Sequence, residues 1–95
     1  MNKIEFFKNN SEVEVDIGEI SYFKEELRIE KNNAEMLVIL DFKEKTCKLK
    51  THTEGLEINI AVISMEHTLL EEKAVFEYVL ESEPKIKNRI NIYEN

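Results

Sequence analysis

The residue types that could carry out chemistry are few in this sequence and lie far apart. The chain has one cysteine, Cys47, and two histidines, His52 and His67. A structural zinc site needs ligands paired at short spacing, as in C-x₂-C, and the sequence contains no such pair. With only two glycines, it also has little room for a glycine-rich phosphate-binding loop. We therefore expect neither a metal site nor a cofactor.

Cys47 is a conceivable nucleophile if a histidine and an acid lie beside it. Strand alternation puts it on the face of Leu49 and Thr51, however, and a lone cysteine on an inward face usually packs as a small hydrophobic residue. The neighbouring Lys48 and Lys50 would lower the thiol pKa only if the sulfur were exposed beside them. We expect a protein that is not an enzyme, and a cysteine- or histidine-based catalytic site ranks third among the functions considered.

Five residues with polar tips fall on the apolar side of predicted strands. Such side chains would orient a small molecule inside a β-barrel, although each could also be an ordinary core residue whose tip bonds to backbone or water. His52 differs, because it continues a row of lysines on the opposite face and is expected at the exposed end of a hairpin. The candidate ligand-binding residues are Tyr22, Cys47, Thr51, His67 and Tyr78.

The length and the charge of the chain limit the kinds of protein that it can be. A chain of 95 residues is expected to form one domain, residues 1–95. Its formal net charge of −7 should repel phosphate backbones and anionic lipid surfaces, so we expect neither a nucleic acid nor a membrane as partner. The sequence has no apolar run long enough for a transmembrane helix, and its charged start does not resemble a signal peptide. We therefore expect a cytoplasmic protein.

A period of two dominates the N-terminal half and is typical of β-strands. Apolar and acidic residues alternate through residues 12–17. Ile20 and Tyr22 then continue the apolar positions with the opposite parity. Because a slip of one residue reverses every side chain, we expect a bulge or a turn at Gly18-Glu19.

Two further segments decide the fold class. Residues 36–42, MLVILDF, are apolar on both parities and predict a strand that is covered on both faces. Residues 63–81 fit either two strands or one helix, because Glu, Lys and Ala favour a helix whereas Phe-x-Tyr-Val-Leu suits a pleated surface. We favour two strands with a turn at 70–73, since the flanking segments are strands. The other turns are expected at 32–33, 43–45 and 53–55.

Taken together, these segments predict an all-β fold. Eight to ten short strands at regular spacing indicate an antiparallel meander that closes into a barrel or a sandwich. The alternative is an α+β fold with one helix within 65–81.

A turn glycine and the strand residues after it follow the pattern of one known family. The matching residues are Gly55, Leu56, Ile58, Tyr78, Leu80, Asn88, Ile90 and Ile92. In this order they resemble the C-terminal half of the YwiB-like bacterial proteins, an uncharacterised family of lipocalin-like (calycin-type) β-barrels. The resemblance implies a small lipocalin-like barrel with an apolar interior cavity, and no catalytic residues, because the family has no established activity. The N-terminal region is short for the family, so the barrel could be incomplete.

The function that these observations favour is a non-enzymatic binding domain that holds a small apolar or amphipathic ligand in the barrel. The alternative is a protein–protein interaction module or a homodimer that uses an exposed strand edge, which an incomplete barrel would leave unpaired. Phe6 and Phe7 are the candidate interface residues, because two adjacent aromatic side chains cannot both point inward from one strand.

Overall fold

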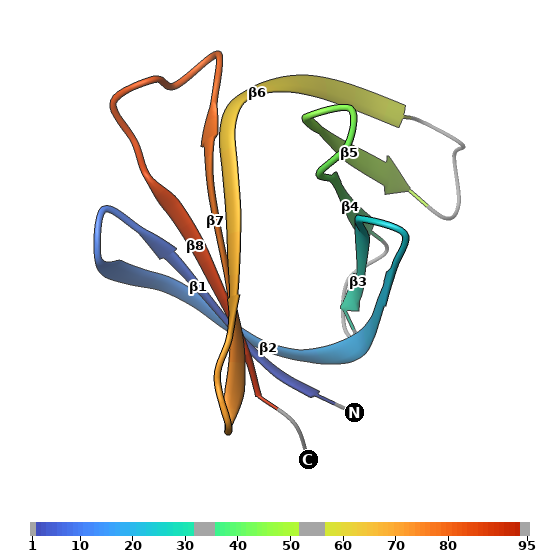
Figure 1. The fold of residues 1–95 in the computed structure, drawn as a ribbon, viewed down its shortest axis with the longest axis vertical. Coiled ribbons are helices and arrows are strands. Elements are labelled where there is room, and N and C mark those ends of the chain that lie inside the picture. Colours follow the sequence, from blue (N-terminus) through green and yellow to red (C-terminus); the bar gives the residue numbers. More distant parts are fainter. Residues whose placement is uncertain (1, 32–35, 52–56, 94–95) are drawn as a thin grey trace.

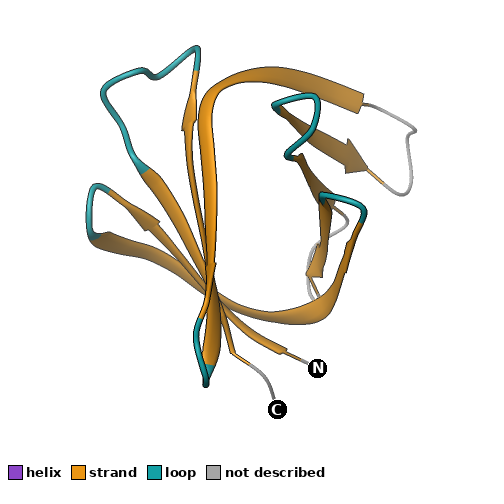
Figure 2. Cartoon of the chain, viewed as in Figure 1, coloured by secondary structure: helices purple, strands orange, loops and turns teal. Residues whose placement is uncertain are grey.

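The computed structural model describes residues 2–31, 36–51 and 57–93, where the chain consists of strands joined by turns and loops (Figure 2). The strands in this part form one closed antiparallel barrel in which sequence neighbours pair and β1 pairs with β8 (Figure 1). They are β1 (Asn2–Lys8), β2 (Ser11–Phe23), β3 (Glu26–Lys31), β4 (Met36–Asp41), β5 (Thr46–Thr51), β6 (Glu57–Leu69), β7 (Lys73–Leu80) and β8 (Asn88–Tyr93).

The predicted antiparallel barrel is confirmed, and it is complete in the described residues. β1 pairs with β8 from Lys3 opposite Tyr93 to Lys8 opposite Asn88. The prediction of an incomplete barrel with a free strand edge is therefore wrong. A short N-terminal region suffices because β2 and β6 have 13 residues each, so that β2 pairs with β1 through its first half and with β3 through its second.

The alternative of a helix within 65–81 is also wrong. This segment contains the end of β6, a turn and β7, and the two strands pair with His67 opposite Phe76 and Leu69 opposite Ala74. Alternate residues of β7 face the interior, where Phe76 is only 3% exposed. Burial of this alternating face outweighs the helix propensity of the Glu and Lys residues, which is a weak preference.

Large aliphatic side chains fill the centre of the barrel. Full burial of one such side chain stabilises the fold by about 1.5–3 kcal/mol relative to its exposure. The largest fully buried side chains come from β1, β3, β4 and β8, and they are Ile4, Leu27, Ile29, Leu40 and Ile90.

The strand MLVILD is covered on both faces, as predicted. Val38 and Leu40 belong to the interior core, whereas Ile39 lies on the outer side of β4 and is nevertheless only 2% exposed. Its cross-strand neighbours are Arg28 and Lys48. Long charged side chains cover apolar surface with their aliphatic stems while the charge stays in water, and this accounts for a buried isoleucine outside the barrel.

β2 carries apolar residues on both of its faces. It runs as one strand through Gly18-Glu19, so the bulge or turn predicted there is wrong. The irregularity in the β1–β2 ladder lies at Val13, which the pairing passes over. The two sets of apolar residues lie on opposite faces of one continuous strand. Ile20 faces the interior, whereas Val15 and Ile17 face outward and are 48% and 52% exposed. The chain therefore needs no change of register at Gly18.

Tight turns join several of the strands. Asn9 and Asn10 adopt the left-handed region with φ of 48° and 68°, which asparagine tolerates. The backbone N–H of Asn9 donates to the carbonyl of Lys87, and the N–H of Lys87 donates to Asn9 Oδ1, both at 2.9 Å. These bonds fix the β1–β2 turn to the loop between β7 and β8.

The predicted turn at 43–45 is confirmed. Asp41 Oδ1 accepts hydrogen bonds from the N–H groups of Lys43 and Glu44, at 3.0 and 2.9 Å. The turns predicted at 32–33 and 53–55, together with His52, lie outside the described residues.

Candidate ligand-binding site

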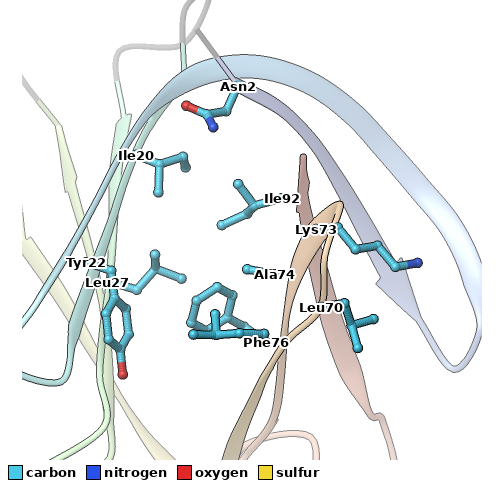
Figure 3. A pocket seen from close by; sticks show the side chains of 10 residues that line it. Asn2, Ile20, Tyr22, Leu27, Leu70, Lys73, Ala74, Phe76 and Ile92 are labelled. Atoms are coloured by element: carbon cyan, nitrogen blue, oxygen red, sulfur yellow. The ribbon is translucent and has the colours of Figure 1, made fainter. Parts of the chain in front are cut away.

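A cavity of about 540 Å³, here called the main cavity, opens at the end of the barrel that carries the β6–β7 turn (Figure 3). Side chains from β1, β2, β3, β7 and β8 surround it, and residues 69 and 70 extend its rim. It is lined by Asn2, Ile20, Tyr22, Leu27, Leu69, Leu70, Lys73, Ala74, Phe76 and Ile92.

The main cavity has an apolar floor and an apolar rim. Leu27, Phe76 and Ile92 reach into it from three strands and are at most 4% exposed. Leu69 and Leu70 stand at the rim with 73% and 53% of their surface exposed. Exposed leucines beside an apolar cavity enlarge the surface that an apolar molecule could cover.

Four rings, here called the aromatic quartet, pack together beside the main cavity, and two of them, Tyr22 and Phe76, line it. Tyr22 comes from β2, Phe42 from the turn after β4, His67 from β6 and Phe76 from β7. Every pair of these rings has centroids 5.6–6.1 Å apart, within the range of favourable aromatic contacts. Tyr22 is still 42% exposed, so part of its ring is available to a ligand.

Two polar side chains without aromatic rings lie among the described residues of this lining. Asn2 donates a hydrogen bond from Nδ2 to the backbone carbonyl of Tyr93 at 3.1 Å. Lys73 is the one charged residue of the lining, and its ammonium points away from the cavity in Figure 3. Its Nζ lies 5.8 Å from the centroid of the Tyr93 ring.

A carboxylate lies near this lysine on the outer surface of the barrel. Glu5 Oε1 accepts hydrogen bonds from the Tyr93 hydroxyl at 2.7 Å and from Asn91 at 3.4 Å, and Oε2 lies 3.9 Å from Lys3 Nζ. The bond from Tyr93 lowers the pKa of Glu5 most, desolvation opposes it, and Asn91, Lys3 and Lys73 add to the lowering. The same hydrogen bond is the main cause of a raised pKa at Tyr93.

A second cavity of about 290 Å³ contains the buried thiol. Cys47, Tyr78 and Asn88 line it together with the charged Lys8 and Glu83. Burial raises the pKa of Cys47 to about 11. The pKa of Tyr78 is also raised, mainly by burial and further by the nearby Cys47 and Glu83. Both groups therefore keep their protons at neutral pH, and a protonated thiol is a poor nucleophile.

The two cavities lie on opposite sides of the central core. On β8, Ile92 lines the main cavity and Asn88 lines the second, while the buried Ile90 stands between them. On β1, the buried Ile4 stands between Asn2 and Phe6 in the same way. The interior of the barrel is thus divided into two separate spaces.

The residues proposed from the sequence to line the barrel divide between two places. Tyr22 and His67 meet in the aromatic quartet, where their ring centroids are 5.7 Å apart. Cys47 and Tyr78 line the second cavity. The side chain of Thr51 lies outside the described part of the structure. The predicted set therefore does not form one site.

Phe6 and Phe7 point to opposite sides of β1, as expected for neighbours in a strand. Phe6 packs against the core and lines the second cavity. Phe7 lies on the outside, where the Arg89 guanidinium carbon is 4.4 Å from the centroid of its ring. Only Phe7 of this pair is on the surface from which an interface could be built.

Sequence reasoning did not single out the residues at the mouth of the main cavity. Leu69, Leu70 and Lys73 all line it, although the sequence places them at the end of a strand and in a turn. The available signal is the pair of adjacent leucines beside a turn, where polar residues are usual.

In the described residues, His, Cys, Asp and Glu side chains form no group of three that could hold a metal ion. This part of the chain also has no helix of the length and apolarity needed to cross a membrane. Comparisons of the chain with protein-family models, with curated proteins and with solved structures found no match. The geometry of the barrel is therefore the basis for assigning a function.

Proposed function

We propose that this protein is a non-enzymatic binding domain that holds a small apolar or amphipathic molecule in its main cavity. The observation that carries the proposal is the cavity itself, about 540 Å³ in volume, walled by aliphatic and aromatic side chains and open at one end. Sites for small molecules typically enclose roughly 300–1,000 Å³, are mostly apolar and contain a few polar groups that orient the ligand. The main cavity has this size and this lining.

Burial of apolar ligand surface would supply the free energy of binding. Each methylene group removed from water contributes about 0.8 kcal/mol, which corresponds to roughly a fourfold gain in affinity. Within a series of straight-chain alcohols, affinity should therefore rise with chain length until the cavity is full.

The proposal is tested by a substitution whose larger side chain fills the main cavity. Ala74 lines the main cavity, whereas Ala61 is exposed on β6 outside it, so Ala74→Trp and Ala61→Trp add the same volume at two different places. We expect the neutral apolar probe N-phenyl-1-naphthylamine to bind the wild type and Ala61→Trp, and to bind Ala74→Trp at least about tenfold more weakly. Circular dichroism confirms that each variant folds. No binding to the wild type, or equal binding to all three proteins, contradicts the proposal.

The resemblance to the YwiB-like family supports the proposal through the type of barrel that it implies. Membership of that family and the lipocalin-like character of the barrel belong to the proposal. So does a cytoplasmic location, which suits a chain whose one cysteine cannot form an internal disulfide.

A second candidate function, self-association or partner binding, is favoured by the outer surface of β2. Val13, Val15 and Ile17 are 56%, 48% and 52% exposed there. Because the described barrel is closed, such contacts would use this outer face in place of a strand edge. A dimer seen by sedimentation velocity that Val15→Lys abolishes supports self-association through this face, and a monomer at all concentrations rules self-association out.

An enzyme with a cysteine- or histidine-based site is the least supported candidate. Burial raises the pKa of Cys47 to about 11, so its thiol is protonated at neutral pH. His67 packs its ring among the other members of the aromatic quartet. Neither residue has the surroundings of an activated nucleophile.

A further inference from the structure

Lys73 differs from the other residues around the main cavity because it carries the only charge in the described lining. It is the first residue of β7 and stands beside the exposed Leu70 at the mouth. Its side chain extends over the outer surface, where Nζ lies 5.8 Å from the centroid of the Tyr93 ring. A lysine at the mouth of an apolar cavity can reach a charged group that emerges from it.

One carboxylate on this surface, Glu5, already has partners other than Lys73. Glu5 accepts a hydrogen bond from the Tyr93 hydroxyl at 2.7 Å and forms an ion pair with Lys3 at 3.9 Å. Lys3 and Lys73 both lie over the Tyr93 ring, at 5.4 and 5.8 Å from its centroid. Of these two lysines, only Lys3 forms an ion pair with a carboxylate of the described residues. Lys73 has the aromatic ring as its partner.

We propose that the ligand of the main cavity is an amphipathic anion, an apolar chain or ring system that ends in a carboxylate or a similar oxyanion. This inference rests on the proposed function and names the class of molecule that the cavity takes. The apolar part occupies the space between Leu27, Phe76 and Ile92, and the head group leaves the mouth beside Leu70. There Lys73 turns from the Tyr93 ring to the head group.

The charges around the mouth set the size of the effect. A lysine over an exposed aromatic ring is weakly held, so this contact costs little to give up. Ion pairs that remain in contact with water are also weak, and Glu71 and Glu72 in the turn before Lys73 oppose an anion. We therefore expect Lys73 to increase the affinity for an anion roughly three- to fivefold at low salt, and less as salt screens the charges.

The experiment compares two ligands that differ only in the head group. Dodecanoate and dodecanol displace N-phenyl-1-naphthylamine from the protein at about pH 8, where the carboxyl group is ionised. The variants are Lys73→Met, which keeps an apolar stem without the charge, and Lys8→Met. Lys8 lines the second cavity at the other end of the barrel, so this control removes an equal charge away from the mouth. Thermal unfolding verifies that both variants are folded.

For the wild type and Lys8→Met, dodecanoate should bind roughly three- to fivefold more tightly than dodecanol. In Lys73→Met this preference for dodecanoate should be lost, because Glu71 and Glu72 then act on the head group unopposed, and the affinity for dodecanol should be unchanged. No preference in the wild type, or a preference that survives in Lys73→Met, overturns this inference and leaves the proposed function standing. Failure of both ligands to bind the wild type overturns the proposed function, and this inference with it.

Discussion

At the scale of single residues, the contact between Glu5 and Tyr93 links the first strand of the barrel to the last. The Glu5 side chain is only 14% exposed, although it lies on the outer face. Its hydrogen bond from Tyr93 is 2.7 Å long and favours the ionised carboxylate together with the protonated hydroxyl. The seam between β1 and β8 is therefore sensitive to the charge state of one side chain.

The lowered pKa of Glu5 predicts how stability depends on pH. Because the pKa in the folded protein lies below the ordinary value of 4.5, the unfolded chain binds this proton more readily. The stabilisation is fully present above about pH 4.5 and is lost as the pH falls through the folded value. Glu5→Gln should therefore lower the free energy of unfolding at about pH 7, and this deficit should be smaller at about pH 3. Urea unfolding at both pH values measures this, and an equal deficit at both contradicts it.

Tyr93→Phe tests the same bond from the other side. The variant keeps the ring between Lys3 and Lys73 but removes the hydroxyl. We expect a loss of about 1 kcal/mol in the free energy of unfolding at neutral pH, the usual net contribution of one hydrogen bond. In a Glu5→Gln background the loss should shrink, because the charged acceptor is gone. Additive losses in the double variant would show that the two groups act independently.

The buried Cys47 should react slowly with thiol reagents. Burial raises its pKa from 9.0 to about 11, which reduces the thiolate fraction about a hundredfold, and the side chain is only 4% exposed. We expect labelling by 5,5′-dithiobis(2-nitrobenzoate) at about pH 8 to be at least about a hundredfold slower than in urea-unfolded protein. Labelling at the unfolded rate would mean that the second cavity is open to solvent.

At the scale of elements, the turn between β2 and β3 holds its two residues in an unfavourable conformation. Lys24 and Glu25 have φ of 51° and 63°, in the left-handed region. The left-handed conformation costs a residue with a β-carbon roughly 1–2 kcal/mol in conformational free energy, whereas glycine adopts it without this cost. Glu25→Gly should therefore raise the free energy of unfolding by about 0.5–1 kcal/mol, since the gain is partly offset by unfolded-chain entropy. Asn10→Gly is the matched control, and we expect a smaller change because asparagine tolerates its φ of 68°.

Strands are the elements that the sequence predicts well, because a period of two is visible without any tertiary information. Which face of a strand turns inward is less visible. Val15 and Ile17 look like core residues, yet they lie outside, and the inward residues of β2 have the opposite parity. Bulges make the inward face harder still to predict. The register of the β6–β7 ladder shifts between Val62 and Ser64, so the inward-facing positions of β6 change from even-numbered to odd-numbered residues there.

At the scale of the whole molecule, the central core should dominate stability. Leu40 is fully buried between neighbouring strands, and Leu70 at the mouth is 53% exposed. Leu40→Ala should lower the free energy of unfolding by about 2–5 kcal/mol, because it leaves a cavity in the centre. Leu70→Ala should change it by less than about 0.5 kcal/mol. Chemical denaturation of both variants compares the two sites, and similar losses would contradict the assignment of the core.

The candidate site could be predicted only in part, for a reason that concerns the whole barrel. Cys47 and Tyr78 line the second cavity, whereas Tyr22 and His67 meet in the aromatic quartet and are both exposed. The height of a residue along the barrel depends on the tilt and stagger of its strand. Alternation in the sequence carries no information on stagger, so it cannot tell which inward residues share one end.

The pairing of β8 with both β1 and β7 also determines when the barrel can form. On the ribosome the first seven strands emerge before the eighth, and the contact between β1 and β8 joins residues at the two extremes of the described chain. Contacts over such a long sequence separation slow folding. Until residues 88–93 are released, the nascent chain has to keep an open sheet away from neighbouring chains, and chaperones would be expected to act in that interval.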